Sequence, residues 1–135
     1  MRHRMLSLAS VAVVGLAVAG AATLTPSAPV CAQQKPVSYA EDVAPIFRGY
    51  CASCHRPGGE GYKASGFDVS SHDSVMAGTK FGRMVIPGQP DASNLVVLIE
   101  GRASPKIQMP YKHHPLPSCL RQTIWTWVFQ GAKNN

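Results

Sequence analysis

Apolar residues recur at helical spacing in four separate segments of the chain, and no segment shows the alternation typical of a strand. The last segment is the clearest. Its apolar positions follow i, i+4, i+7, i+8 and i+11 spacing, at Leu120, Ile124, Trp127, Val128 and Gly131. Pro117 suits the first position of this helix, because proline lacks the backbone N–H that a helix start leaves unpaired. The pattern predicts an all-α fold.

The first predicted helix begins near Ser38, which with Glu41 fits a capping box. Pro45 lies inside this segment and moves the expected start of the regular helix toward Asp42. The apolar residues at helical spacing are Val43, Ile46, Phe47 and Tyr50. A glycine-rich stretch, residues 56–66, follows and is predicted to be a loop.

Two short helices are predicted in the middle of the chain. Ser70 or Ser71 caps the first, which ends at Gly78. Asp91 caps the second, and Gly101 ends it after an apolar run of Leu95, Val96, Leu98 and Ile99. Residues 102–117 contain four prolines, which predict an extended loop before the last helix.

Residues 1–32 are predicted to be a secretory signal peptide, followed by a single domain at residues 33–135. The leader has a basic start, an uncharged apolar run over residues 5–24, and small residues around Ala32, after which cleavage is expected. An uncleaved membrane anchor is the alternative, because the run approaches the roughly 20 residues that span a bilayer. A lipidated start at Cys31 is disfavoured by Pro29 and Val30 before it. The domain is therefore expected to be periplasmic or otherwise exported, or membrane-tethered if the leader remains.

The basic charge of the chain does not indicate nucleic-acid binding. Thirteen Lys and Arg against seven Asp and Glu give a net charge of +6, and loss of Arg2 and Arg4 with the leader lowers it to +4. The remaining basic residues are dispersed singly, whereas a phosphate-binding surface gathers them on one face. They predict a solvated surface with weak attraction for an acidic partner.

The segment CASCH, residues 51–55, holds two of the four cysteines three residues apart, with a histidine directly after them. Cysteines in an exported domain usually form a disulfide framework, but too few remain for one here. A structural zinc site needs four ligands, and the only second pair, His113 with His114, consists of neighbours that rarely point at one metal. A thioredoxin-like dithiol requires a βαβ pattern that this sequence lacks.

Covalent haem attachment is the use of CASCH that the sequence favours. In such a motif the thiols of Cys51 and Cys54 add to the haem vinyl groups, and His55 is placed to ligate the iron. The motif follows an amphipathic helix in an exported chain, and further ligands are available downstream.

The domain resembles a class I c-type cytochrome over about residues 38–133. The motifs that carry the resemblance occur in family order, at residues 42–47, 51–55, 87–93, Met109 with Pro110, and 127–132. The resemblance implies an all-α fold wrapped around one covalently bound haem c, with His55 and Met109 as axial ligands. It also implies electron transfer between redox protein partners.

The context of Met109 agrees with that role. A thioether is a soft, uncharged ligand that binds haem iron opposite histidine, and Pro110 with the extended loop suits a fixed sulfur. Met76 and Met84 lie in apolar surroundings and are interpreted as core residues. His113 and His114 are the rival ligands, although exposed loop histidines are the preferred interpretation.

Two further observations bear on the function. No constellation of acid, base and nucleophile indicates an enzyme, and a haem enzyme or sensor would require an exchangeable iron ligand. Cys119 departs from the family pattern: it is interpreted as a partly buried residue, with a reactive thiol or a disulfide to Cys31 as alternatives. The sequence thus predicts an exported carrier of single electrons, with a tethered electron-transfer subunit of a larger redox complex as the alternative.

Overall fold

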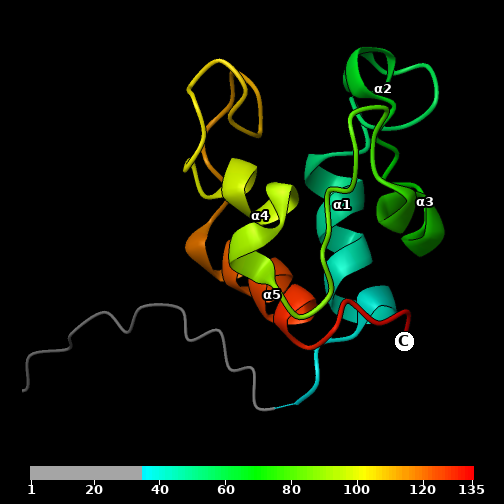
Figure 1. Cartoon of the computed structure of the whole chain (residues 1–135), viewed down its shortest axis with the longest axis vertical. Coiled ribbons are helices and arrows are strands. Elements are labelled where there is room, and N and C mark those ends of the chain that lie inside the picture. The colour runs from blue at the N-terminus through cyan, green and yellow to red at the C-terminus, as the bar shows by residue number, and fades with distance from the viewer. Residues whose placement is uncertain (1–34) are drawn as a thin grey trace, which may run out of the picture.

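The computed structural model describes residues 35–135, which are helical and contain no β-strand (Figure 1). The predicted all-α fold is confirmed for this part of the chain. The leader and its cleavage site lie outside the described residues. In chain order the elements are a π-helical turn η1 (Tyr39–Val43), α1 (Ala44–Tyr50), α2 (Glu60–Ser65), α3 (His72–Ala77), a 3₁₀ turn η2 (Pro90–Ala92), α4 (Asn94–Ile99) and α5 (Ser118–Phe129).

Ser38 caps the first helical segment, as the sequence predicted. Its hydroxyl accepts a hydrogen bond from the Glu41 backbone N–H at 3.2 Å. The return bond differs, because the Ser38 N–H donates to the Asp42 carboxylate at 2.8 Å and not to Glu41. Pro45 is in the first turn of α1, where its missing N–H costs nothing. Tyr50 was expected on the apolar stripe but is 49% exposed.

The predicted loop over residues 56–66 is wrong, because α2 forms within it. Gly59 is the extended N-cap residue, Glu60 occupies the first turn, and Gly66 ends the helix with a left-handed φ of 76°. Lys63 pairs with Glu60 at 2.8 Å on the exposed side. Gly59 and Gly66 therefore mark the start and the end of a helix. The number of glycines in residues 56–66 had indicated a loop.

The helices α3 and α4 occur where they were expected, but only one has the expected cap. Ser71 caps α3 through a reciprocal pair of hydrogen bonds with Ser74, both 3.1 Å long. Asp91 does not cap α4, because it lies in η2 and Ser93 is the N-cap residue. The buried Ser93 hydroxyl instead donates to the Gln89 carbonyl at 2.8 Å and thereby ties η2 to α4.

Four aromatic side chains form a cluster between η1, α1, α3 and α5. Trp127 is 1% exposed, and its ring centroid lies 5.6 Å from that of Tyr39, 6.4 Å from Phe47 and 6.0 Å from His72. Its indole N–H donates to the Lys133 carbonyl at 2.9 Å, so the only polar group of this side chain is satisfied. Trp127 therefore packs on the first helix, against Phe47 of α1. Trp125 is half-buried and stacks on the exposed Phe129.

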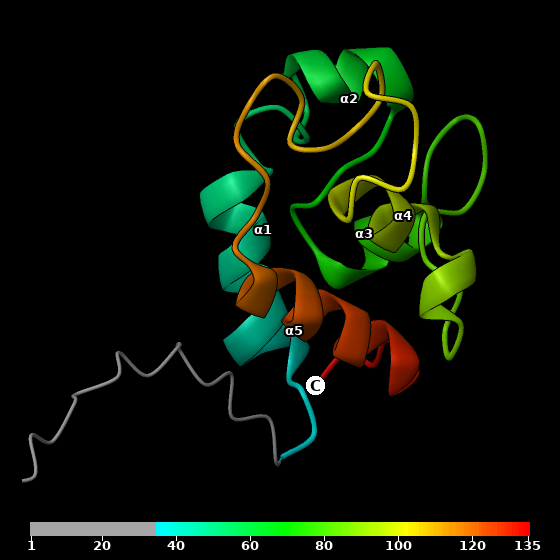
Figure 2. The ribbon, with the colours of Figure 1, turned by 90° about the vertical axis from the view of Figure 1, so that its left-hand side faces the viewer.

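The two ends of the described chain are bonded together. The Asn135 carbonyl accepts hydrogen bonds from the Ser38 hydroxyl at 2.7 Å and from the Ala40 N–H at 3.0 Å, and its side chain accepts from the Tyr39 N–H. Helix α2 and the loop of residues 101–117 lie at the opposite end of the molecule (Figure 2). The hydrogen bonds that join the two chain ends therefore lie far from the segments that carry the predicted ligands.

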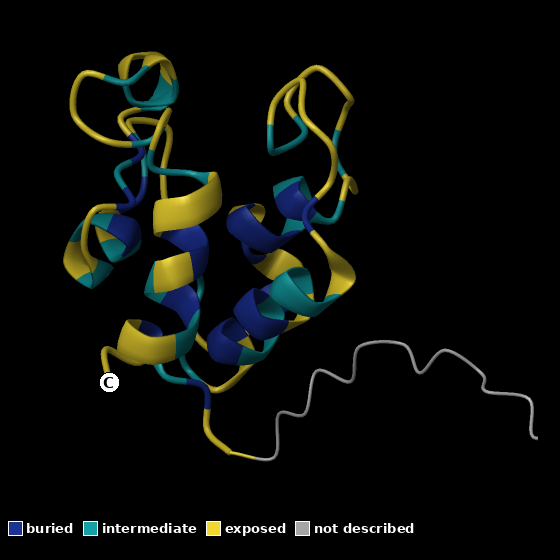
Figure 3. Ribbon diagram, turned by 180° about the vertical axis from the view of Figure 1, so that it is seen from behind, coloured by how far each residue is buried: buried dark blue, intermediate teal, exposed yellow. Residues whose placement is uncertain are grey.

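Burial differs sharply between these two ends (Figure 3). The aromatic cluster and the residues of η1, α1, α4 and α5 beside it supply most of the buried core. No residue is buried in residues 48–66 or 100–115. The predicted ligands therefore lie on segments with little apolar packing of their own.

Candidate haem site

The CASCH segment continues α1 as a further turn. The Cys51 N–H donates to the Phe47 carbonyl at 2.9 Å, and the His55 N–H donates to the Cys51 carbonyl at 2.8 Å. The turn therefore places both thiols and the imidazole on one short piece of backbone anchored to the buried part of α1. Cys51 and Cys54 are free cysteines.

The two thiols differ in environment. Cys51 is half-buried, and burial together with the nearby Cys54 raises its pKa to about 11. Cys54 is exposed. The Cys51 thiol is therefore protonated at neutral pH and is held against the core, whereas the Cys54 thiol faces outward.

His55 is fixed at its backbone and partly buried at its ring. Its carbonyl accepts a hydrogen bond from the Val69 N–H at 2.8 Å, and the Phe67 ring lies edge-on with centroids 5.6 Å apart. Burial lowers the pKa of His55, and the neighbouring Phe67 backbone opposes this only in part. The imidazole is therefore neutral near pH 7, the form that binds a metal. Its Nδ1 is buried without a hydrogen-bond partner.

The backbone after His55 passes close to the motif. The Tyr62 N–H donates to the Cys54 carbonyl at 2.9 Å, and a Cβ on Gly59 would collide with that same carbonyl oxygen. A Cβ on Gly61 would likewise come too close to the His55 ring, at 2.7 Å from Cε1. Sequence reasoning missed α2 as part of the site. The sequence offered no local signal for this contact, because several glycines close together indicate a loop.

Met109 lies in the loop of residues 101–117, which rises at the same end of the molecule as α2 (Figure 1). Its N–H donates to the Leu98 carbonyl at 3.1 Å, so this residue is tied to the end of α4. The side chain is half-buried and packs against the core, as do Met76 and Met84. Its role as an iron ligand stays a prediction.

His113 and His114 are both exposed, as expected of histidines in a polar loop. The His113 N–H donates to the Pro110 carbonyl at 3.2 Å, which closes a turn just after Met109. Among residues 35–135 no three His, Cys, Asp or Glu side chains come together in a group able to hold a metal ion.

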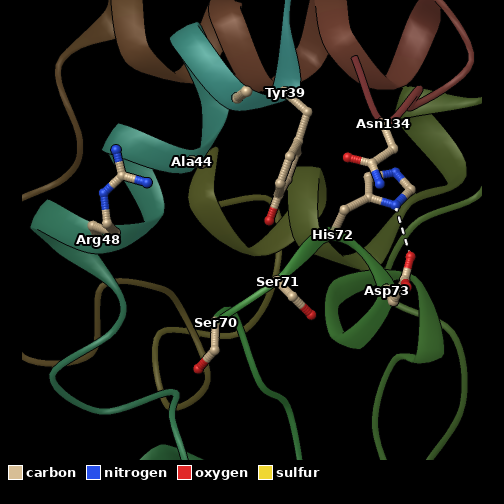
Figure 4. Close-up of a pocket in the computed structure, with 9 residues that line it drawn as sticks. Tyr39, Ala44, Arg48, Ser70, Ser71, His72, Asp73 and Asn134 are labelled. Atoms are coloured by element: carbon tan, nitrogen blue, oxygen red, sulfur yellow. Dashed lines mark hydrogen bonds and ion pairs between the residues drawn. The ribbon is translucent and has the colours of Figure 1, made fainter.

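A polar surface pocket of about 380 Å³ is lined by residues of η1, α1 and the start of α3, together with Asn134 (Figure 4). The Tyr39 ring stands between Arg48 and His72, and the His72 Nδ1 lies 3.4 Å from an Asp73 carboxylate oxygen. The His72 Nε2 is also 2.8 Å from the Ala132 carbonyl oxygen. His72 thus begins α3, as expected of a polar residue there, and none of the predicted ligands lines this pocket.

Cys119 is the second residue of α5 and is disulfide-bonded. In the full chain, Cys119 is therefore not a free thiol. The alternative pairing with Cys31 involves a residue outside the described part of the chain.

The model of the family described as Planctomycete cytochrome C matches residues 51–112, just under half of the chain. The matched range begins at the first cysteine of CASCH and ends three residues after Met109. The match supports a cytochrome c-type domain. Such a domain carries covalently bound haem c and transfers electrons to and from redox protein partners. No curated protein and no solved structure matches the chain significantly.

The residues of the site fit this cofactor. Two free thiols and a neutral imidazole share one turn, the chemical set that covalent haem attachment requires. The glycines beside them leave room for close approach of the backbone.

Among residues 35–135 no helix has both the length and the apolar character needed to cross a bilayer.

Proposed function

We propose that the protein is an exported c-type cytochrome that carries single electrons between redox partners and holds one haem. In this proposal Cys51 and Cys54 would hold the haem through thioether links from their sulfurs, and His55 and Met109 would ligate its iron. The arrangement of CASCH carries the proposal: free thiols beside a half-buried, neutral imidazole whose backbone is bonded on both sides.

Each proposed residue has a definite task. The haem, when bound, supplies a reversible one-electron couple. Hydrogen bonds to α1 and to Val69 hold the His55 backbone, so the imidazole is presented in one place. The hydrogen bond from Met109 to Leu98 fixes the loop at the residue whose sulfur is the proposed second ligand. A thioether ligand favours the reduced state relative to a second imidazole, so this pair raises the reduction potential.

The proposal explains why the segments around the site contain no buried residue. Residues 48–66 and 100–115 expose or half-expose apolar groups that include Tyr50, Ile107 and Tyr111. A domain of about 100 residues has a marginal core, and a large apolar cofactor adds buried area to it. The haem-binding segments thus depend on the cofactor for packing that the aromatic cluster provides elsewhere.

Absorption spectra of the purified native protein test the proposal. We expect the oxidised and reduced spectra of covalent haem c, with the weak far-red band of ferric haem that reports iron–methionine bonding. Met109→Ala should abolish that band, whereas Met84→Ala should retain it, because both methionines are half-buried and only Met109 is the proposed ligand. A protein without covalent haem, or a band that survives Met109→Ala, contradicts the proposal.

Export can be tested on the same preparation. Sequencing the N-terminus of the native protein should give a start directly after Ala32, and cell fractionation should place the haem protein outside the cytoplasm. An intact N-terminus in a membrane fraction would instead support the tethered alternative.

A further inference from the structure

Gly61 lies against the ring of His55 more closely than any side chain could. A Cβ built on Gly61 would be 2.7 Å from Cε1 of the imidazole and 2.9 Å from both Nδ1 and Nε2. Carbon atoms in van der Waals contact are normally about 3.5 to 4.0 Å apart. A methyl group at this position therefore requires the imidazole or the helix to move.

The three distances also show where the methyl would lie. A group approaching Cε1 in the ring plane would be clearly farther from the two nitrogens than from Cε1. The nearly equal distances of 2.7, 2.9 and 2.9 Å place it over the face of the ring instead. The backbone of α2 at Gly61 thus lies against one face of the imidazole ring.

Helix α2 cannot withdraw easily from that contact. Its first half is bonded to the motif through the Tyr62 N–H and the Cys54 carbonyl, 2.9 Å apart. Its end is held by the Lys80 N–H, which donates to the Ser65 carbonyl at 2.9 Å. The Phe67 ring restricts the imidazole from another side. The strain of an added methyl group would therefore fall on His55.

No backbone requirement explains glycine at position 61. Gly61 is absent from the residues of positive φ, unlike Gly58 and Gly66 on either side of it. Glycine is also a poorer helix former than alanine. The close approach to His55 is the feature that a larger residue would disrupt.

We propose that Gly61 is a positioning residue for His55: by allowing the α2 backbone to lie on the ring face, it sets the plane of the imidazole that ligates the haem iron. This inference rests on the proposed function and adds to it a determinant of the iron's electronic environment. The plane of an axial imidazole affects the splitting of the ferric d orbitals, and the position of its nitrogen affects the reduction potential.

Comparing Gly61→Ala with Gly49→Ala in the haem-loaded protein tests the proposal. Gly49 lies in α1 and also lacks a positive φ, but no heavy atom lies within 4 Å of a Cβ placed there. We expect Gly61→Ala to change the g-values of the ferric electron paramagnetic resonance spectrum and to shift the reduction potential. Gly49→Ala should leave both as in the wild type. A Gly61→Ala protein with wild-type g-values and potential overturns the proposal.

A second variant covers the case in which Gly61→Ala prevents haem attachment. Phe67→Leu, added to Gly61→Ala, opens space beside the imidazole, although removing buried ring atoms normally lowers stability. Recovery of covalent haem in the double variant supports a clash at the ring. Without recovery, the defect is a general one of the helix and the proposal fails. Absence of covalent haem from the wild-type protein would reject the proposed function itself.

Discussion

The aromatic cluster and the candidate haem site are built in opposite ways. Tyr39, Phe47, His72 and Trp127 come from four elements and pack on one another, so this end of the molecule is stabilised by its own side chains. Around CASCH and Met109, no residue between 48 and 66 or between 100 and 115 is buried, and close backbone contacts predominate. The first end is therefore a scaffold of packed side chains, and under the proposed function the second would gain packing from the haem.

Preventing haem attachment should give the largest change, a loss of protection from hydrogen exchange that is confined mainly to the candidate haem site. In the Cys51→Ala/Cys54→Ala protein we expect amide protons of residues 51–66 and 100–115 to exchange at least about 100-fold faster than in the haem-loaded protein, because these segments have little apolar packing. Amides of α5 should keep measurable protection. Hydrogen exchange followed by mass spectrometry makes the comparison, and equal protection at the site in both proteins would contradict it.

Trp127→Ala tests how much the aromatic cluster contributes to the free energy of unfolding. Removing this 1% exposed side chain deletes three ring contacts and one hydrogen bond, at an expected cost of about 3 to 5 kcal/mol in the free energy of unfolding. Denaturant titration of the haem-loaded protein measures it. Phe129→Ala is the control on the same helix, because Phe129 is 58% exposed, and should change stability by no more than about 0.5 kcal/mol.

Ser71→Ala should have a smaller effect, limited to the start of α3. It removes the cap acceptor for the Ser74 N–H and is expected to cost about 1 kcal/mol. Ser70→Ala makes a matched control, because Ser70 is exposed and precedes the cap. Thermal unfolding should separate the two variants, and equal stabilities would show that the cap contributes little.

Tyr39→Phe should give the smallest effect, visible only at alkaline pH. Burial raises the pKa of Tyr39 above its usual value near 10, with Arg48 opposing the shift. The folded state thus retains a proton that the unfolded state loses. The stability that the protonated Tyr39 side chain contributes is fully present below about pH 10. It is lost as the pH rises through the folded-state pKa. Stability measured from pH 9 upward should fall less steeply in Tyr39→Phe than in the wild type.

The scaffold was the more predictable half from sequence. The stripe in the last helix correctly indicated the buried Trp127 and Val128, because a helical repeat of apolar residues reports directly on burial. A serine cap for α3 was also correctly predicted, with Ser70 and Ser71 as the two candidates, and Ser71 is the one that forms it. Asp91 was wrongly expected to cap α4, because an intervening 3₁₀ turn shifts the helix start to Ser93.

The site was less predictable because its geometry depends on contacts between segments. CASCH predicts the chemistry of the candidate site, but the helix α2 was missed because propensity alone interprets several glycines as a loop. The contact of Gly61 with His55 depends on how α2 folds back over the motif. No local pattern reports such an approach.

The hydrogen bonds that close the chain at Asn135 also fix an orientation. They hold residues 37–40 beside the C-terminal residues, at the end of the molecule opposite α2 and the Met109 loop. A lipid surface or larger assembly joined to the domain through residue 35 would meet that closed end. The end that carries α2 and the Met109 loop would then point outward into the surrounding solution, within reach of a diffusing partner.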